Sequence, residues 1–267
     1  MKPFLAVLFC LASALSAGAQ ALDLSADIVF LGEQHDNPAH HARQAQLVAE
    51  LAPKALVFEM LTPEQASKAT PDILSDAKAL GDALQWQQSG WPDFSWYHPI
   101  FTSAPGAMIV GAAVPREAAR EVMEQDVAQV FGPAAADFGL TEPLSEDQQA
   151  TREALQMAAH CDALPKEMLP LMVSIQRLRD ARLAEAALQA FEQTGGPVAV
   201  ITGNGHARKD WGAPAALALA APGVRVVALG QGETDVGAPD GVFDVTELSA
   251  PIQREDPCKA FLEQRGN

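Results

Sequence analysis

The feature of this sequence that most constrains its fold is a series of short apolar runs, separated by segments with a helical pattern. The runs are residues 27–32, 55–60, 107–112, 197–203 and 224–230, and residues 241–247 are a candidate edge strand. Their length, β-branched residues and flanking turn residues predict buried strands. A helix is predicted after the first of them, because Asn37 followed by Pro38 is a good N-cap and first-turn pair. Strands that alternate with helices predict an α/β fold with a mainly parallel sheet flanked by helices.

The alternation stops between the third and fourth runs. Residues 145–160 and 166–193 have helical patterns, and no strand pattern is evident in between. We therefore expect a helical insert at about residues 113–196 that packs over the carboxyl end of the sheet.

The N-terminus is typical of a secretory signal peptide. Lys2 is followed by an apolar stretch of about 12 residues and then by small residues suited to cleavage after Ala19. The stretch is shorter than the roughly 18 residues of a membrane span. We expect residues 1–19 to be removed, residues 20–267 to form a single domain, and the protein to be periplasmic. Cys10 lies within the apolar stretch and not in a lipobox, so a lipid anchor is not favoured.

Charge and cysteine content restrict the function classes further. The formal net charge is −16, and it becomes −17 when Lys2 leaves with the signal peptide. Such an acidic chain repels nucleic acid and anionic lipid. Cys161 and Cys258 then remain, an even pair that suits one disulfide in an exported chain, with two unpaired thiols as the alternative.

Polar side chains follow three of the predicted strands, where the carboxyl ends of a parallel sheet collect ligands. The sequence GEQH supplies Glu33 and His35, FEM supplies Glu59, and TGNGH supplies Asn204 and His206. The pattern GxxH occurs twice, and we expect its glycines to let the backbone turn sharply. One such pattern arises often by chance, but the pair around a glutamate favours a shared pocket.

Two other segments carry candidate groups. The aromatic stretch around Trp91 contains Tyr97, the only tyrosine, and His98, and each is a candidate iron ligand in an apolar setting. The alternative is an aromatic patch that packs a helical layer. In QRLRDA, Arg179 and Asp180 share one helical face with the preceding glutamine, and an exposed surface pair is the alternative.

Taken together, the motifs LGEQHDNPAHH, FEM, WYHPIF, VPRE, QRLRDA and GNGHARKDWGAP resemble the ChaN family of exported haem-binding uptake proteins. That family is part of the Tiki and TraB superfamily, which is related to erythromycin esterases. The resemblance implies that dimers hold haem in an apolar pocket with a tyrosine on the iron, a role that falls to Tyr97. It also implies ligand contacts from His98, from Arg116 and from Arg179.

The resemblance further implies a common pocket built from the strand-end residues, which are Glu33, His35, Glu59, Asn204 and His206. The leading hypothesis is a non-catalytic periplasmic haem carrier that could be dimeric and pass haem to or from an outer-membrane receptor or transport component. The alternative is a hydrolase, either with a divalent metal or with His35 as general base, oriented by Glu59 and helped by His206. An inert interaction protein is a third hypothesis.

Overall fold

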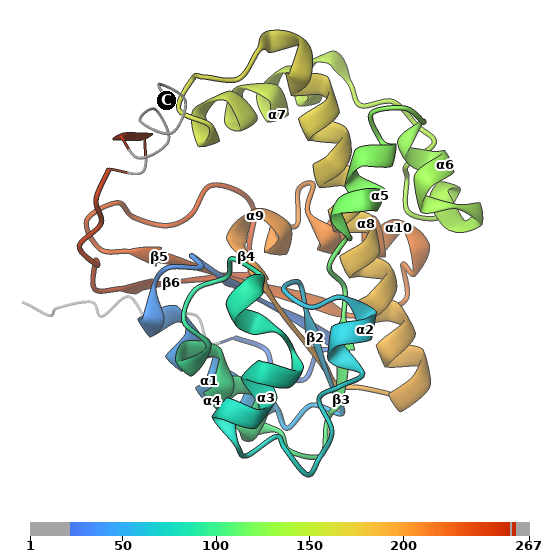
Figure 1. The fold of residues 1–267 in the computed structure, drawn as a ribbon. Coiled ribbons are helices and arrows are strands. Elements are labelled where there is room, and N and C mark those ends of the chain that lie inside the picture. The colour runs from blue at the N-terminus through green and yellow to red at the C-terminus, as the bar shows by residue number, and fades with distance from the viewer. Residues whose placement is uncertain (1–21, 257, 260–267) are drawn as a thin grey trace, which may run out of the picture.

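The sheet is parallel throughout and has six strands within the described part of the chain. A computed structural model describes residues 22–256 and 258–259, shown in Figure 1. The predicted signal peptide lies outside these residues. The strands are β1 (Ile28–Glu33), β2 (Ala55–Phe58), β3 (Met108–Gly111), β4 (Val198–Gly203), β5 (Val226–Glu233) and β6 (Val245–Ser249). Their order is β3-β2-β4-β1-β5-β6, and every neighbouring pair is parallel. The predicted α/β fold is confirmed, including the edge strand.

Helices cover both faces of this sheet (Figure 1). They are α1 (Pro38–Leu51), α2 (Pro63–Ala66), α3 (Ala77–Ala83), α4 (Phe94–Ser103), α5 (Arg116–Glu121), α6 (Val127–Phe131), α7 (Glu146–Ala159), α8 (Leu169–Thr194), α9 (Asn204–Ala207) and α10 (Ala213–Ala220), with 3-10 turns η1 (Trp86–Gln88), η2 (Pro133–Ala136) and η3 (Lys166–Met168).

Helix α1 begins and ends where its sequence predicts. The side chain of Asn37 accepts a hydrogen bond from the backbone N–H of Ala39, and Pro38 fills the first turn, where its missing N–H costs nothing. Ala52 then adopts a left-handed conformation, with φ of 45°, and returns its N–H to the carbonyl of Val48.

Two hydrophobic layers result from the alternation of side chains along the strands. In β1, Val29 and Leu31 pack into the layer with α1 and α4, whereas Ile28 and Phe30 pack into the layer with α8 and α10. All four are fully buried. Because successive strand residues point to opposite faces, a continuous apolar run is what a strand covered on both faces requires.

The chain also changes direction at the centre of the sheet. From β1 it passes through α1 on one face to β2, and from the neighbouring β4 it passes through α10 on the other face to β5. The carboxyl ends of β1 and β4 therefore flank a crevice, the usual ligand position in an open parallel sheet.

A helical segment stands over that carboxyl edge, as predicted. The described chain between β3 and β4 forms helices and turns, and α7 packs against the long helix α8 beyond the strand ends (Figure 1). Cys161, just after α7, forms a disulfide with Cys258, with 5.4 Å between the two Cα atoms. The predicted pairing is thus confirmed, and it ties the C-terminal segment to α7. No helix within the described residues combines the length and apolarity that crossing a membrane would take.

Candidate functional site

A buried glutamate at the end of β1 organises the first part of the site. Glu33 is 2% exposed, and its Oε1 accepts hydrogen bonds from His35 Nδ1 at 2.8 Å and from the hydroxyl of Tyr97 at 2.7 Å. Burial raises the pKa of this carboxyl, but the imidazoles of His35 and His41 more than offset it and bring the pKa to about 2. Glu33 is therefore an anion that fixes the orientation of His35.

Tyr97 lies in the core, beneath this glutamate. Its exposed fraction is 0%, and its ring packs against Trp86 and His41 at centroid distances of 4.8 and 4.2 Å. Burial, together with the charge and hydrogen bond of Glu33, raises the pKa of the phenol well above its usual range. In this structure Tyr97 is a neutral donor to a carboxylate.

A second imidazole is held by two carboxylates from other elements. His206, in α9, has its Nδ1 2.6 Å from Asp180 Oδ1 on α8, and its Nε2 lies 3.7 Å from Glu59 Oε1 just after β2. Burial lowers the pKa of His206, but Glu59 and Asp180 raise it more, to about 9. Glu59 is fixed in turn, since its Oε2 accepts hydrogen bonds from the hydroxyl of Thr202 and the N–H of Gly203 at 2.6 and 2.8 Å.

The two GxxH glycines allow neighbouring side chains to approach the backbone closely. The sharp backbone turn that was expected at these glycines is not found. Gly32 is an ordinary strand residue, and Gly203 has φ of −65°. A Cβ on Gly203 would lie 2.9 Å from His35 Nε2, and one on Gly32 would lie 2.6 Å from Asn204 Oδ1. Only a residue without a side chain lets these groups approach the strand ends.

Asn204 connects two strands. Its Nδ2 donates to the carbonyl oxygen of Gln231 at 2.8 Å, and its Oδ1 accepts from the N–H of Gln231 at 2.9 Å. Both ends of the side-chain amide are therefore engaged with β5, although Asn204 also lines the cavity described next.

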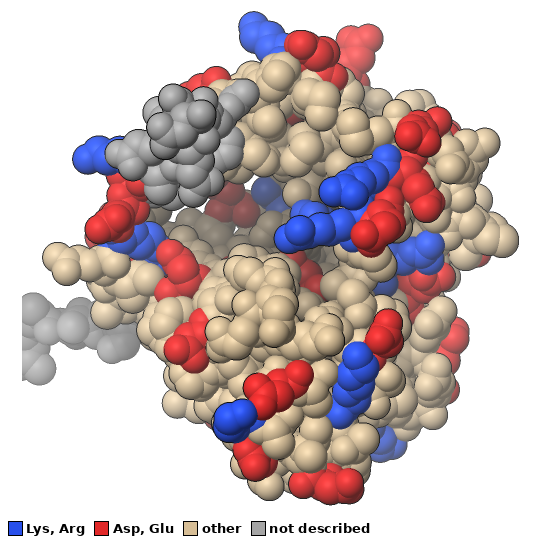
Figure 2. Space-filling view, in the orientation of Figure 1, with Lys and Arg blue, Asp and Glu red and all other residues tan. Residues whose placement is uncertain are grey.

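A cavity of about 860 Å³ lies between the strand ends and the helical cover. Figure 2 shows this face of the molecule hollowed beneath α7, with basic and acidic side chains visible in the hollow. The side chains that matter most here are those of Glu33, His35, Asp36, Arg152, Gln156, Gln176, Asp180, His206, Arg208 and Trp211. His35 brings the more accessible of the two imidazoles, because its side chain is 35% exposed whereas that of His206 is 12% exposed.

A second cavity of about 120 Å³ lies on the other side of His206. Glu59, Trp91 and Arg179 line it. The helical face predicted from QRLRDA is thus divided, since Asp180 faces the large cavity and Arg179 the small one.

The structure places Glu33, His35, Asn204 and His206 around the large cavity and Glu59 beside the small one, with His206 lining both, and it places three other candidates elsewhere. Tyr97 is in the core. The Nε2 of His98 bonds the carbonyl of Leu74 at 2.9 Å, and Arg116 is exposed at the start of α5. None of these three lines either of the two cavities.

Sequence reasoning missed most of the basic groups of the site. Arg152 comes from a helix whose sequence reads as solvated, and Arg208 and Trp211 come from the loop after α9. The guanidinium of Arg208 lies 3.6 Å from the centroid of the Trp211 ring and bonds both carboxylate oxygens of Asp210 at 2.7 and 2.5 Å. The stretch ARKDWGAP directly after the second GxxH contains both Arg208 and Trp211 and was the signal that the sequence offered.

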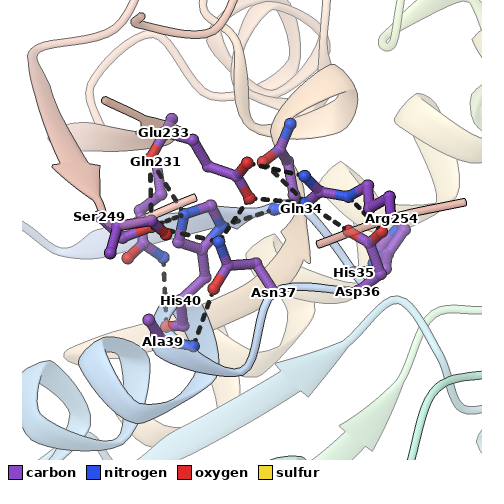
Figure 3. A network of polar contacts seen from close by, with 12 residues as sticks. Gln34, His35, Asp36, Asn37, Ala39, His40, Gln231, Glu233, Ser249 and Arg254 are labelled. Carbon is purple, nitrogen blue, oxygen red and sulfur yellow. Dashed lines mark hydrogen bonds and ion pairs between the residues drawn. The ribbon is translucent and has the colours of Figure 1, made fainter. Parts of the chain in front are cut away.

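A polar network behind the cavity wall was also missed (Figure 3). The guanidinium of Arg254 bonds both carboxylate oxygens of buried Glu233 at 2.7 and 2.6 Å and both of Asp36 at 2.5 and 2.9 Å. Asn37, the N-cap of α1, donates to the same Glu233 at 2.5 Å. The hydrogen bond of Arg254 lowers the pKa of Glu233 to about 2. The C-terminal segment is thereby fastened to the strand ends.

Among residues 22–256 and 258–259, no three or more His, Cys, Asp or Glu side chains are grouped so that they could hold a metal ion.

Comparison with known proteins gives one family. The family described as "Haem-binding uptake, Tiki superfamily, ChaN" matches residues 22–217. A solved structure described as "Cofacial heme binding to ChaN of Campylobacter jejuni" is 21% identical, with a TM-score of 0.60, over 78% of this chain and 82% of that one. The type III effector HopBA1 is 15% identical, with a TM-score of 0.44, over 84% and 88% of the respective chains. No curated protein matches significantly.

Proposed function

The chain belongs to the ChaN family of haem-binding uptake proteins in the Tiki superfamily, and we propose that it binds haem in the large cavity at the carboxyl edge of its sheet. The cavity is about 860 Å³, within the 300–1,000 Å³ that is typical of sites for small organic ligands. The observation that carries the proposal is an oriented, accessible imidazole in this cavity, together with the family match. The ChaN of Campylobacter jejuni is described as binding haem, which supports the same ligand here.

His35 is the residue we propose for the iron. Its Nδ1 is bonded to Glu33, so Nε2 is the nitrogen left free to bind a metal. Metal-bound histidines usually have their other ring nitrogen bonded to a carboxylate or a carbonyl, which fixes the ring and makes it a better ligand. When bound, haem would supply an iron for which His35 is the proposed protein ligand.

Iron ligation by Tyr97 stays a prediction. The phenol would have to leave Glu33 and emerge from the core, because its oxygen is bonded to that carboxylate and its ring is fully buried. The charge of Glu33 also disfavours the phenolate, which is the form that binds ferric iron. These costs are why we place His35 ahead of Tyr97.

The biological role that we propose for the protein is the one that its family implies. We propose that the exported protein carries haem in the periplasm without turnover, as a homodimer that exchanges haem with an outer-membrane receptor or transport component. Size-exclusion chromatography with and without haem tests the dimer.

The test of the proposed function is a titration of ferric haem into the mature protein, followed by visible absorption, beside His35→Ala and Tyr97→Phe. We expect saturable binding by wild type, a changed spectrum and weaker binding for His35→Ala, and a spectrum like wild type for Tyr97→Phe. Absence of saturable binding by wild type would refute the proposal.

A second candidate function rests on His206. Because its pKa of about 9 keeps it protonated near neutral pH, the His206 imidazole flanked by Asp180 and Glu59 resembles a general acid that is oriented by carboxylates, as in hydrolases that protonate a leaving group. The assay is hydrolysis of a panel of aryl and lactone esters, in which Glu59→Gln and His206→Gln should abolish any turnover shown by wild type. Turnover that survives both changes would dismiss this candidate.

A further inference from the structure

The large cavity contains a cation to which the described residues give no hydrogen-bond or ion-pair partner. Arg152 lies on α7, lines the cavity and is half-buried. Within the described chain it makes no hydrogen bond or ion pair, and its Nε is buried without an acceptor. Its guanidinium lies over the Trp211 ring, 5.2 Å from the centroid. A buried donor without an acceptor is costly, so native structures rarely keep one without a purpose.

Most other charges of the cavity wall are already paired within the described residues. Arg208 bonds both carboxylate oxygens of Asp210. Asp180 is bonded to His206 and Asp36 to Arg254. Asp180 is close enough to attract Arg152, but the two do not pair. Arg152 is thus the lining arginine whose donors are free for a ligand.

One further carboxylate, that of Asp240, lines the cavity. It has no partner within the described residues, but it is exposed, so water and salt screen its charge. The guanidinium of Arg152 is partly buried, and its charge acts more strongly there than it would in water. The cavity therefore offers an anion its best counter-charge at Arg152.

Polar side chains near Arg152 add further hydrogen-bond donors to the cavity wall. Gln156 follows Arg152 by one helical turn on α7 and lines the same cavity, as does Gln176 on α8. Their amides can donate hydrogen bonds beside the guanidinium. A planar guanidinium with flanking donors matches the geometry of a carboxylate, which it can bind through two parallel N–H bonds.

We propose that Arg152 is the anchor for a carboxylate of the ligand that the large cavity binds. The inference rests on the proposed function, so the carboxylate is a propionate side chain of the porphyrin. The anchor is on the helical cover, whereas His35 is on the sheet edge, so one ligand would bridge the two layers.

The test separates the carboxylate from the iron by using metal-free porphyrins. Protoporphyrin IX and its dimethyl ester differ only in whether the propionates carry charge. Each is titrated into wild type, Arg152→Gln and Arg120→Gln, with tryptophan fluorescence as the readout. Arg120→Gln removes the same charge from an exposed position on α5 outside both cavities, and so controls for net charge.

We expect wild type and Arg120→Gln to bind the free acid about 10- to 100-fold more tightly than the ester, as charge-assisted hydrogen bonds imply. Arg152→Gln should lose this preference while its affinity for the ester is unchanged. Its unfolding temperature without ligand should fall little, because Arg152 makes no hydrogen bond or ion pair with the described residues that the change would remove. A marked fall would instead indicate a purely structural arginine.

Equal affinity of wild type for acid and ester, or an undiminished preference in Arg152→Gln, overturns the anchor while haem binding stands. If wild type binds neither porphyrin nor ferric haem, the proposed function fails, and the anchor fails with it.

Discussion

Replacing Tyr97 by Phe separates the two readings of this residue, as a buried donor and as an iron ligand. The change removes a 2.7 Å hydrogen bond to a buried carboxylate and leaves the ring packing in place. A hydrogen bond to a charged group is worth about 1.5–3 kcal/mol. We expect the lower part of this range, about 1.5–2 kcal/mol, because His35 still bonds the same oxygen of Glu33. For a domain of this size that lowers the unfolding temperature by roughly 3–8 °C.

The assay is thermal and urea unfolding of the apo protein, in a cycle with Glu33→Gln. The effect of Tyr97→Phe should shrink markedly in the Glu33→Gln background, because the charged acceptor is gone. The ferric haem spectrum of Tyr97→Phe should match that of wild type. An unchanged stability together with a lost haem spectrum would refute the reasoning and make Tyr97 the iron ligand.

Three further predictions concern the frame of the site. Cys258→Ser should lower the free energy of unfolding, measured in urea, by about 2–5 kcal/mol, because the disulfide to Cys161 closes a loop with a sequence separation of 97 residues. Reduced wild type should be destabilised to the same extent. Equal stability of the oxidised, reduced and substituted proteins would count against the prediction. The pKa of His206 is raised from 6.5 to about 9, so the stability that its charged form gives the folded protein is full below pH 6.5 and is lost as the pH rises through about 9. Urea unfolding midpoints across this range should show the loss in wild type but not in His206→Gln. Identical pH profiles for the two proteins would contradict the prediction. Arg254→Gln should lower the free energy of unfolding by about 3 kcal/mol, because Glu233 stays buried without its cation. The pKa of Glu233, about 2 in wild type, should rise, so acid unfolding followed by circular dichroism should move to higher pH. Acid unfolding at the same pH as wild type would exclude this role for Arg254.

The strands and the core of the site could be predicted from the sequence because both depend on local pattern. Buried parallel strands are continuous apolar runs, and the groups that follow them meet at one edge whatever the loops do. The fifth strand runs past its predicted end because Gln231 and Glu233 are buried polar residues that interrupt the apolar pattern. Their partners, Gly32 and Arg254, are far away in sequence.

The buried position of Tyr97 had a signal in the sequence that the prediction did not use. Phe94, Tyr97 and Phe101 are spaced by three and four residues, so they share one face of α4, and all three are buried. That spacing favours a core position over a ligand pocket.

Arg152 had no comparable signal. Helix α7 has no buried residue, and its polar sequence is that of a solvated surface. Only the placement of α7 over the strand ends makes its single arginine part of the cavity wall. Such residues follow from tertiary packing, which no local pattern contains.

The measurement that tests the central claim most directly is the position of the iron in crystals of the protein grown with ferric haem, located by anomalous diffraction at the iron edge. We expect an iron peak in the large cavity beside Nε2 of His35, with a propionate directed at Arg152. An iron peak beside Tyr97 with α4 displaced, or outside the cavity altogether, would contradict it.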